Sequence, residues 1–162
     1  MILIALGANL PSRAGQPSET LRAALGALAD RGISVRAVSK FFITPAWPDP
    51  NDPSFVNAVA RIRTDLAPKA LLDVLHAVEA AFGRERGARN APRPLDLDLI
   101  DYDGRVEDGP PELPHPRAAE RGFVLIPLAD IAPGWRHPVS GKTVETLIAG
   151  LSQGQRKVEE LK

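Results

Sequence analysis

Two aspartates, Asp96 and Asp98, lie two residues apart in the otherwise apolar segment 95–100, and their spacing is suited to metal chemistry. In a strand, residues two apart point to the same face, with roughly 6.5–7 Å between their Cα atoms. Two carboxylates on one face repel each other unless a cation lies between them, and hard oxygen ligands favour Mg²⁺ over zinc. Two metal ions about 3.5–4 Å apart would fit this arrangement. The alternative is an edge strand with a solvated polar face.

An arginine-rich segment, 83–94, precedes the two aspartates. It contains Arg84, Arg86, Arg89 and Arg93 but only one acidic residue, and its two glycines and two prolines exclude a regular helix or a central strand. A guanidinium group matches phosphate oxygens bidentately. Four arginines beside a carboxylate pair therefore predict a polyphosphate held by arginines on one side and by metal on the other. Taken alone, the segment could also be a solvated loop.

Two further segments place polar or aromatic residues where a ligand could reach them. In the predicted strand 55–64, Phe55 and Asn57 share one face, while the apolar surface of Val56, Ala58, Ala60 and Ile62 faces the helices. A ring can stack on a flat heterocycle, and an amide can both donate and accept hydrogen bonds; the alternative places Phe55 in the core. On the predicted helix 68–82, Glu79 lies at the rim of the buried face, where a surface salt bridge is the alternative.

The predicted elements follow the order βαββαβ. They are strand 2–6, helix 18–30, strand 33–44, strand 55–64, helix 68–82 and the Asp-x-Asp strand. This order is typical of an α+β ferredoxin-like sandwich, in which an antiparallel sheet carries both helices on one face and leaves the other face free for ligands. A proline-rich C-terminal extension with short helices near 122–131 and 143–151 follows. Length and composition suit one domain over residues 1–162.

Composition narrows the class of function. The 20 basic and 20 acidic residues give no net charge, so the arginine cluster is local and broad nucleic-acid binding is disfavoured. Cysteine is absent, which excludes disulfides, thiolate catalysis and cysteine-based zinc sites. The first residues lack a signal-peptide pattern and are too few to span a membrane, so we expect a cytoplasmic protein. No Walker-type loop is present, and arginines and metal must hold any phosphates.

Several short motifs, taken in order, resemble those of the 6-hydroxymethyl-7,8-dihydropterin pyrophosphokinase family. They are Leu6-Gly7-Ala8-Asn9-Leu10, Gly83-Arg84-x-Arg86, Arg93-x-Leu95-Asp96-Leu97-Asp98, Pro114-His115 and Arg121-Gly122-Phe123. The resemblance covers nearly the whole chain. It implies an ATP-dependent diphosphotransferase of folate biosynthesis, which transfers the β,γ-diphosphate of ATP to the hydroxymethyl group of 6-hydroxymethyl-7,8-dihydropterin and releases AMP.

The resemblance also implies roles for individual residues. The implied catalytic residues are Arg84, Arg93, Asp96 and Asp98, with both aspartates holding two Mg²⁺ ions; the ATP-binding residues are His76, Glu79, Arg86, His115 and Arg121; and the pterin-binding residues are Thr44, Pro45, Trp47, Phe55, Asn57 and Phe123. A core position for Phe123 and a surface position for Trp47 are alternatives. The expected partners are the two small-molecule substrates, without nucleic acid or a membrane, and we expect a monomer.

The chain departs from the family's pattern at a few positions. Asn90-Ala91 stand where many relatives have Trp-Gly, Pro94 replaces a threonine, and Pro116 follows His115 where a tyrosine is frequent. The charged residues are all present, so we expect an active enzyme with slower turnover or altered affinity. Two other classes stay open: a ferredoxin-like nucleic-acid-binding module, and a catalytically inactive relative that binds pterin or ATP.

Overall fold

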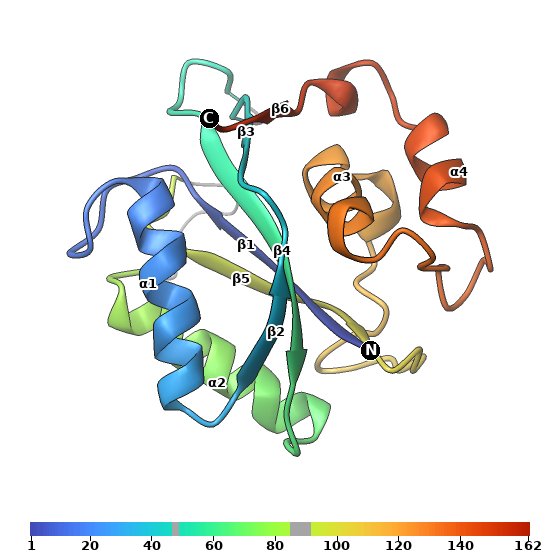
Figure 1. The fold of residues 1–162 in the computed structure, drawn as a ribbon, viewed down its shortest axis with the longest axis horizontal. Helices are drawn as coiled ribbons and strands as arrows, with labels where there is room; N and C mark the ends of the chain where they lie inside the picture. The colour runs from blue at the N-terminus through green and yellow to red at the C-terminus, as the bar shows by residue number, and fades with distance from the viewer. Residues whose placement is uncertain (47–48, 85–91) are drawn as a thin grey trace.

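The computed structural model describes residues 1–46, 49–84 and 92–162, and it places helices on both sides of one antiparallel sheet (Figure 1). The strands are β1 (Ile2–Ala8), β2 (Ser34–Val38), β3 (Phe42–Thr44), β4 (Phe55–Arg63), β5 (Asp96–Tyr102) and β6 (Glu159–Glu160). The helices are α1 (Pro17–Asp30), α2 (Pro68–Ala81), α3 (Gly122–Ile131) and α4 (Val144–Ala149), with single 3₁₀ turns at Ala118–Glu120 and Gly154–Arg156. No helix in these three ranges is long and apolar enough to cross a membrane.

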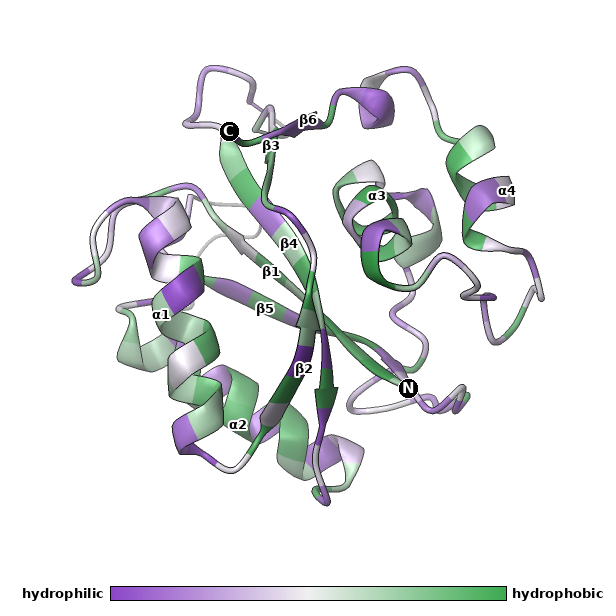
Figure 2. Ribbon diagram, in the orientation of Figure 1, coloured by the Kyte–Doolittle hydropathy of each residue, from purple (hydrophilic) through white to green (hydrophobic). Residues whose placement is uncertain are grey.

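Strand β1 is a central strand of the sheet because its side chains are apolar on both faces. All seven of its residues are buried, and it pairs with β4 on one side and β5 on the other. The strand order is β5-β1-β4-β3-β6, and β2 also pairs with β4. Figure 2 shows the hydrophobic β1 passing between the two helix layers. The predicted ferredoxin-like α+β arrangement is therefore confirmed.

Helices α1 and α2 cover one face of the sheet, as their apolar spacing predicts. Leu21, Ala24 and Leu28 of α1 are fully buried, as are Leu71, Leu75 and Val78 of α2. They pack against every second residue of the strands, including Leu95, Leu97 and Leu99 beside the aspartates. The predicted alternation of the Asp-x-Asp strand is confirmed: the leucines are in the core, and the carboxylates point to the opposite face.

The prediction that this opposite face is left free for ligands is wrong where α3 and α4 pack on it. A second core, formed by Leu3, Ala5, Val59 and Ile100 of the sheet, packs against Val124, Leu125 and Leu128 of α3 and against α4. The reason is visible in β1, which is apolar at consecutive positions and so must be buried on both faces. The ligand-accessible part shrinks to the end of the face that carries Asp96. A nucleic-acid-binding sheet surface is correspondingly disfavoured.

The predicted single strand 33–44 is two strands, β2 and β3, which both pair with β4. The break falls at Ser39, a buried residue whose hydroxyl accepts a hydrogen bond from the Val59 N–H at 3.0 Å, while its own N–H donates to the Val59 carbonyl at 2.9 Å. A side-chain oxygen thus replaces a main-chain oxygen in the ladder. The short β3 that results carries Thr44 to the ligand-accessible end.

The C-terminal extension closes the far edge of the sheet. Strand β6, which the sequence did not predict, pairs with β3, and the Leu161 N–H donates to the Phe41 carbonyl at 2.8 Å. Helix α3 has the predicted bounds, whereas α4 is shorter than its prediction. The extension is tied to β5 by the Trp135 indole, which donates to the buried Asp101 carboxylate at 2.8 Å.

Candidate active site

Strand register brings three functional positions into one row across the sheet. Asp96 of β5 pairs with Gly7 of β1, and Gly7 pairs on its other side with Asn57 of β4. Directly paired residues point to the same face, so the carboxylate and the amide lie on the face that α3 covers only in part. Gly7 separates them without a side chain. The row divides the candidate site into a charged side, around Asp96, and a neutral side, around Asn57.

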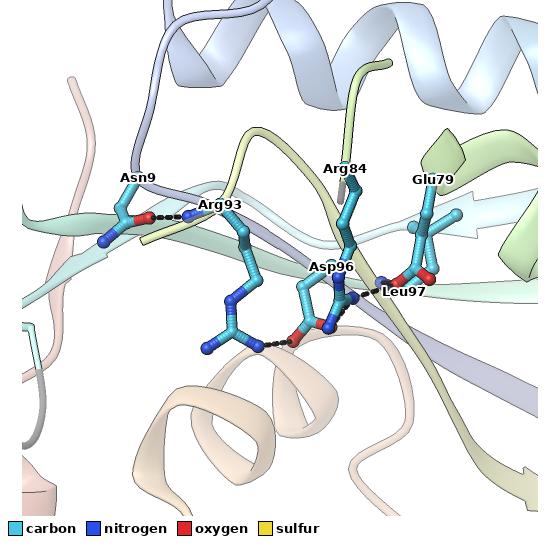
Figure 3. A network of polar contacts seen from close by, with 6 residues as sticks. All are labelled: Asn9, Glu79, Arg84, Arg93, Asp96 and Leu97. Carbon is cyan, nitrogen blue, oxygen red and sulfur yellow. Dashed lines mark hydrogen bonds and ion pairs between the residues drawn. The ribbon is translucent and has the colours of Figure 1, made fainter. Parts of the chain in front are cut away.

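The charged side is built on a buried glutamate. Glu79, near the end of α2, has a side chain only 3% exposed; its Oε2 accepts hydrogen bonds from the Arg84 guanidinium and, at 2.8 Å, from the Leu97 N–H of β5. The prediction of a rim position is therefore wrong, as is the surface salt bridge, because Glu79 is buried against β5, whose Leu97 N–H it accepts. Figure 3 shows Glu79, Arg84 and Asp96 as one polar network.

Arg84 joins the two carboxylates of this network. One guanidinium nitrogen contacts Glu79 and also lies 2.5 Å from Asp96 Oδ1. Burial lowers the pKa of Arg84, but the attraction of Asp96 and Glu79 outweighs burial and leaves its pKa above the ordinary value. Arg84 therefore stays charged, with its side chain 18% exposed at the edge of the site.

Arg93 reaches Asp96 from the other side. Its guanidinium lies 3.5 Å from Asp96 Oδ2 and 5.8 Å from the centre of the Phe55 ring. The Asp96 carboxylate thus lies between two arginines (Figure 3). Its side chain is 24% exposed, so a ligand can reach it.

Asp98 lies two residues after Asp96 on the same face of β5. Among the described contacts it has no arginine partner as close as those of Asp96. Burial, followed by the negative charge of Asp96, raises the pKa of Asp98 to about 7, while Arg121 opposes this shift. The two carboxyl groups are close enough for the charge of one to oppose ionisation of the other. A bound divalent cation would remove this repulsion and favour the ionised form of both. The pair fits a hard cation such as Mg²⁺ on these grounds. No group of three or more candidate ligand side chains occurs in the described ranges.

His115 and Arg121 approach the carboxylates from the segment before α3. The His115 N–H donates to the Ile100 carbonyl of β5 at 2.9 Å, which fixes the residue beside the strand. Burial and the nearby Arg121 lower the pKa of His115 to about 4, so its ring is neutral near pH 7. Its Nδ1 accepts the Arg117 N–H at 3.2 Å, which assigns the ring proton to Nε2. That N–H is available as a donor.

The neutral side is a packed amide and hydroxyl pair. Asn57 is buried, and its Nδ2 donates to the Thr44 hydroxyl at 2.8 Å. A Cβ at Gly7 would lie 2.8 Å from Asn57 Oδ1, so only glycine leaves the amide where it is. Phe55 borders this pair and is half-buried, which removes the alternative of a core phenylalanine; Pro45 follows Thr44 and is exposed.

Phe123 stands at the start of α3. It is half-buried against the second core, and the Arg121 guanidinium lies 5.4 Å from its ring centre. The alternative of a core position for Phe123 therefore holds only in part, because the ring packs against the second core without being fully buried. His76 is half-buried on α2, three residues before Glu79.

Five positions named from the sequence lie outside the described residues: Trp47, Arg86, Arg89, Asn90 and Ala91. Conversely, the structure adds one residue that sequence reasoning left without a role. Asn9 is buried and accepts the Arg93 N–H at 2.8 Å. Its signal in the sequence is its place in the motif Leu6-Gly7-Ala8-Asn9-Leu10, directly after the apolar strand β1.

A sequence comparison decides the family. Residues 3–133 match the model of the family described as 7,8-dihydro-6-hydroxymethylpterin-pyrophosphokinase. The chain belongs to this family. Similar curated proteins named 2-amino-4-hydroxy-6-hydroxymethyldihydropteridine pyrophosphokinase occur in Methylorubrum extorquens (40% identity, covering 96% of this chain and 97% of the relative), Pseudomonas aeruginosa (41%; 91% and 90%) and Synechocystis (40%; 90% and 73%).

Solved structures agree on the fold of this pyrophosphokinase family member. A crystal structure of Plasmodium falciparum HPPK-DHPS has a TM-score of 0.65 to this chain at 13% identity, and a second, a triple mutant of the same protein, has a TM-score of 0.69 at 14% identity. The match covers 90% of this chain but only 43% of each Plasmodium chain. At such identity the likeness establishes the shared fold alone.

Proposed function

We propose that this chain transfers the β,γ-diphosphate of ATP to the hydroxymethyl oxygen of 6-hydroxymethyl-7,8-dihydropterin, giving AMP and the pterin diphosphate of folate biosynthesis. The observation that carries the proposal is the row Asp96–Gly7–Asn57, which sets a carboxylate with arginine partners beside a neutral amide on one sheet face. A polyanion and a flat heterocycle can thus bind next to each other on this face.

The phosphates belong on the charged side. Arg84 and Arg93 already flank Asp96, and a phosphate chain beside them would take over guanidinium donors that the carboxylate now occupies. Arg121, near Asp98, and the Nε2–H of His115 supply donors from the opposite wall. Glu79 acts through Arg84, because it is buried beneath that side chain. Roles for His76 and Arg86 at the nucleotide remain part of the proposal.

The two aspartates would hold the metal. Mg²⁺ binds few protein carboxylates and keeps substrate phosphates and waters as its remaining ligands, which suits a site with only Asp96 and Asp98 to offer. We propose that these two residues hold two ions. When bound, the ions supply charge neutralisation on the phosphates and acidify the attacking hydroxyl. A strong protein base is then unnecessary.

The pterin belongs on the neutral side. Asn57 keeps its carbonyl oxygen and one N–H beyond the hydrogen bond to Thr44, so it can pair with a ring edge that has both donors and acceptors. Phe55 and Phe123 are half-buried aromatic rings that can stack on its two faces. Thr44 and Pro45 would offer main-chain groups. We also keep Trp47 as a proposed pterin contact.

The transfer itself is one displacement at the β-phosphorus. The pterin oxygen forms a bond to that phosphorus, the bond from the phosphorus to the oxygen bridging to the α-phosphate breaks, and AMP leaves with that oxygen. The hydroxyl proton passes to water. Arg84 and Arg93 stabilise the charge that spreads over the transferring oxygens, a type of contact whose loss typically costs about 2.7–4 kcal/mol.

A product assay tests this function directly. Purified protein with Mg²⁺, ATP and 6-hydroxymethyl-7,8-dihydropterin should give AMP and pterin diphosphate by chromatography. Asp96→Ala should lower turnover on the order of a hundred- to thousand-fold. Asp73→Ala, an exposed aspartate paired with Lys69, is the matched control and should leave it unchanged. ADP as the product, or no product at all, would contradict the proposal; the second result would favour an inactive binding relative.

We further propose that one copy of the chain suffices. The contacts that define both sides of the site are all made within a single chain. The absence of cysteine fits a reducing compartment, in keeping with the proposed cytoplasmic location. Light scattering at working concentration should give the mass of a monomer, and a dimer mass would overturn that part.

A further inference from the structure

The segment between β1 and α1, residues 9–16, is fixed in place by contacts at several points. The Ser12 and Gly15 main chains exchange two hydrogen bonds of 2.9 and 3.0 Å, and the Ser12 hydroxyl lies 2.6 Å from that of Thr20 on α1. Arg13 donates to the Ala81 carbonyl at 3.0 Å, and its guanidinium lies 4.7 Å from the centre of the Phe82 ring. The segment is therefore anchored to both helices of the first layer.

Asn9 extends from this anchored segment to the main chain of Arg93. Its Oδ1 accepts the Arg93 N–H at 2.8 Å, and its own N–H donates to the Arg93 carbonyl at 3.2 Å. These two bonds hold residue 93 as a strand partner would, although neither residue is in a strand. Figure 3 shows Asn9 beside the main chain of Arg93, whose side chain extends to Asp96.

The same amide also holds the neutral side. Asn9 Nδ2 donates to the Pro53 carbonyl at 3.2 Å, two residues before Phe55. The Arg93 guanidinium lies over the Phe55 ring and beside the Asp96 carboxylate. One buried side chain thus connects the end of β1, the segment before β4 and the main chain of Arg93.

We infer that Asn9 is a positioning residue, which sets the Arg93 guanidinium relative to Asp96 and Phe55 and so aligns the charged side of the site with the neutral side. This inference rests on the proposed function for its kinetic consequence. Its structural consequence does not, because the contacts of Asn9 exist without substrate. Residues that orient a group in direct contact with the reacting atoms typically contribute about 10- to 100-fold in activity.

A double-mutant cycle separates positioning from general stability. Arg93→Ala removes the guanidinium but keeps the main-chain N–H and carbonyl that Asn9 holds. We expect Asn9→Ala to lower kcat about 10- to 100-fold in the wild-type background, and less than about threefold in the Arg93→Ala background. Asn51→Ala, an exposed asparagine in the neighbouring segment, is the matched control. Equal losses in both backgrounds, or a loss of kcat below about threefold in the wild type, would overturn the inference.

Amide hydrogen exchange supplies a readout that does not depend on turnover. Exchange of the Arg93 N–H should be faster in Asn9→Ala than in the wild type, while exchange of the β1 amides should stay protected if the variant is folded. Unchanged protection of the Arg93 N–H would overturn the inference even in an inactive protein. If the wild type makes no pterin diphosphate but Arg93 loses protection in the variant, the proposed function fails and the placement of Arg93 by Asn9 stands.

Discussion

The charged and neutral sides of the site are held in position by different forces. On the charged side, Arg84, Glu79 and Asp96 compensate one another, so each side chain is placed by its ion-pair partners. On the neutral side, Asn57 is placed by strand register and by the missing side chain of Gly7. Phosphate binding must therefore exchange existing ion pairs, whereas the pterin enters a place that is already arranged. We therefore expect a substitution on the charged side to disturb several side chains together, and a substitution on the neutral side to have a local effect.

Removal of Glu79 should have the largest effect. Glu79→Ala leaves the Arg84 guanidinium without its buried partner and the Leu97 N–H without its acceptor. Loss of one member of a buried ion pair typically costs about 3–5 kcal/mol. Chemical denaturation should show a loss of this order in the free energy of unfolding, together with weaker ATP binding. A loss below about 1 kcal/mol would mean that the network does not hold the charged side together.

A methyl group at Gly7 should damage only the neutral side. Its Cβ would lie 2.8 Å from Asn57 Oδ1, and overpacking of this kind typically costs about 1–3 kcal/mol. Gly7→Ala should raise the KM for the pterin and leave the KM for ATP unchanged in steady-state kinetics. Gly26→Ala, on α1 with open space around its Cβ, is the matched control. Equal increases in both KM values would show that the two sides are not separable.

The ionisation of Asp98 should give a smaller, pH-dependent effect. Burial and the charge of Asp96 raise its pKa to about 7 from an ordinary value of 3.8, so the folded protein holds this proton more tightly than the unfolded chain. The resulting stabilisation is complete below the lower value and is lost as the pH rises through about 7. The metal-free protein should therefore lose part of its thermal stability between about pH 6 and pH 8.

Asp98→Asn isolates this contribution. His115, whose lowered pKa stabilises the folded state at higher pH, acts in both proteins and cancels in their difference. Thermal unfolding should show that the Tm of the variant falls less steeply with pH than the Tm of the wild type across the same range. Parallel curves for the two proteins would contradict the raised pKa of Asp98.

The charged residues of β5 could be predicted from the sequence because residues two apart in a strand point to the same face. Alternation in a strand predicted the face of Asp96 and Asp98, and the core position of the leucines that alternate with them confirms it. Helical spacing likewise predicted the buried faces of α1 and α2. Phe55 and Asn57 were placed correctly on one face for the same reason.

The misses concern features that depend on contacts between distant segments. Glu79 is buried because β5 donates a main-chain N–H to it, which the pattern of α2 alone cannot show. The break at Ser39 depends on a hydroxyl that bonds Val59 twenty residues away. The cover that α3 provides could have been predicted from the apolar residues on both faces of β1. The single domain over residues 1–162 stays a prediction.

Separate binding measurements on the two sides test whether the site is divided in this way. Calorimetry would use an ATP analogue that cannot be cleaved between the α- and β-phosphates, and then titrate the pterin into the saturated complex. Arg84→Ala should raise the Kd of the analogue by about tenfold or more and leave the Kd of the pterin unchanged. Asn57→Ala should raise the Kd of the pterin and leave that of the analogue unchanged. If each variant weakened both ligands equally, or if Arg84→Ala weakened only the pterin, the division into a charged and a neutral side would be contradicted.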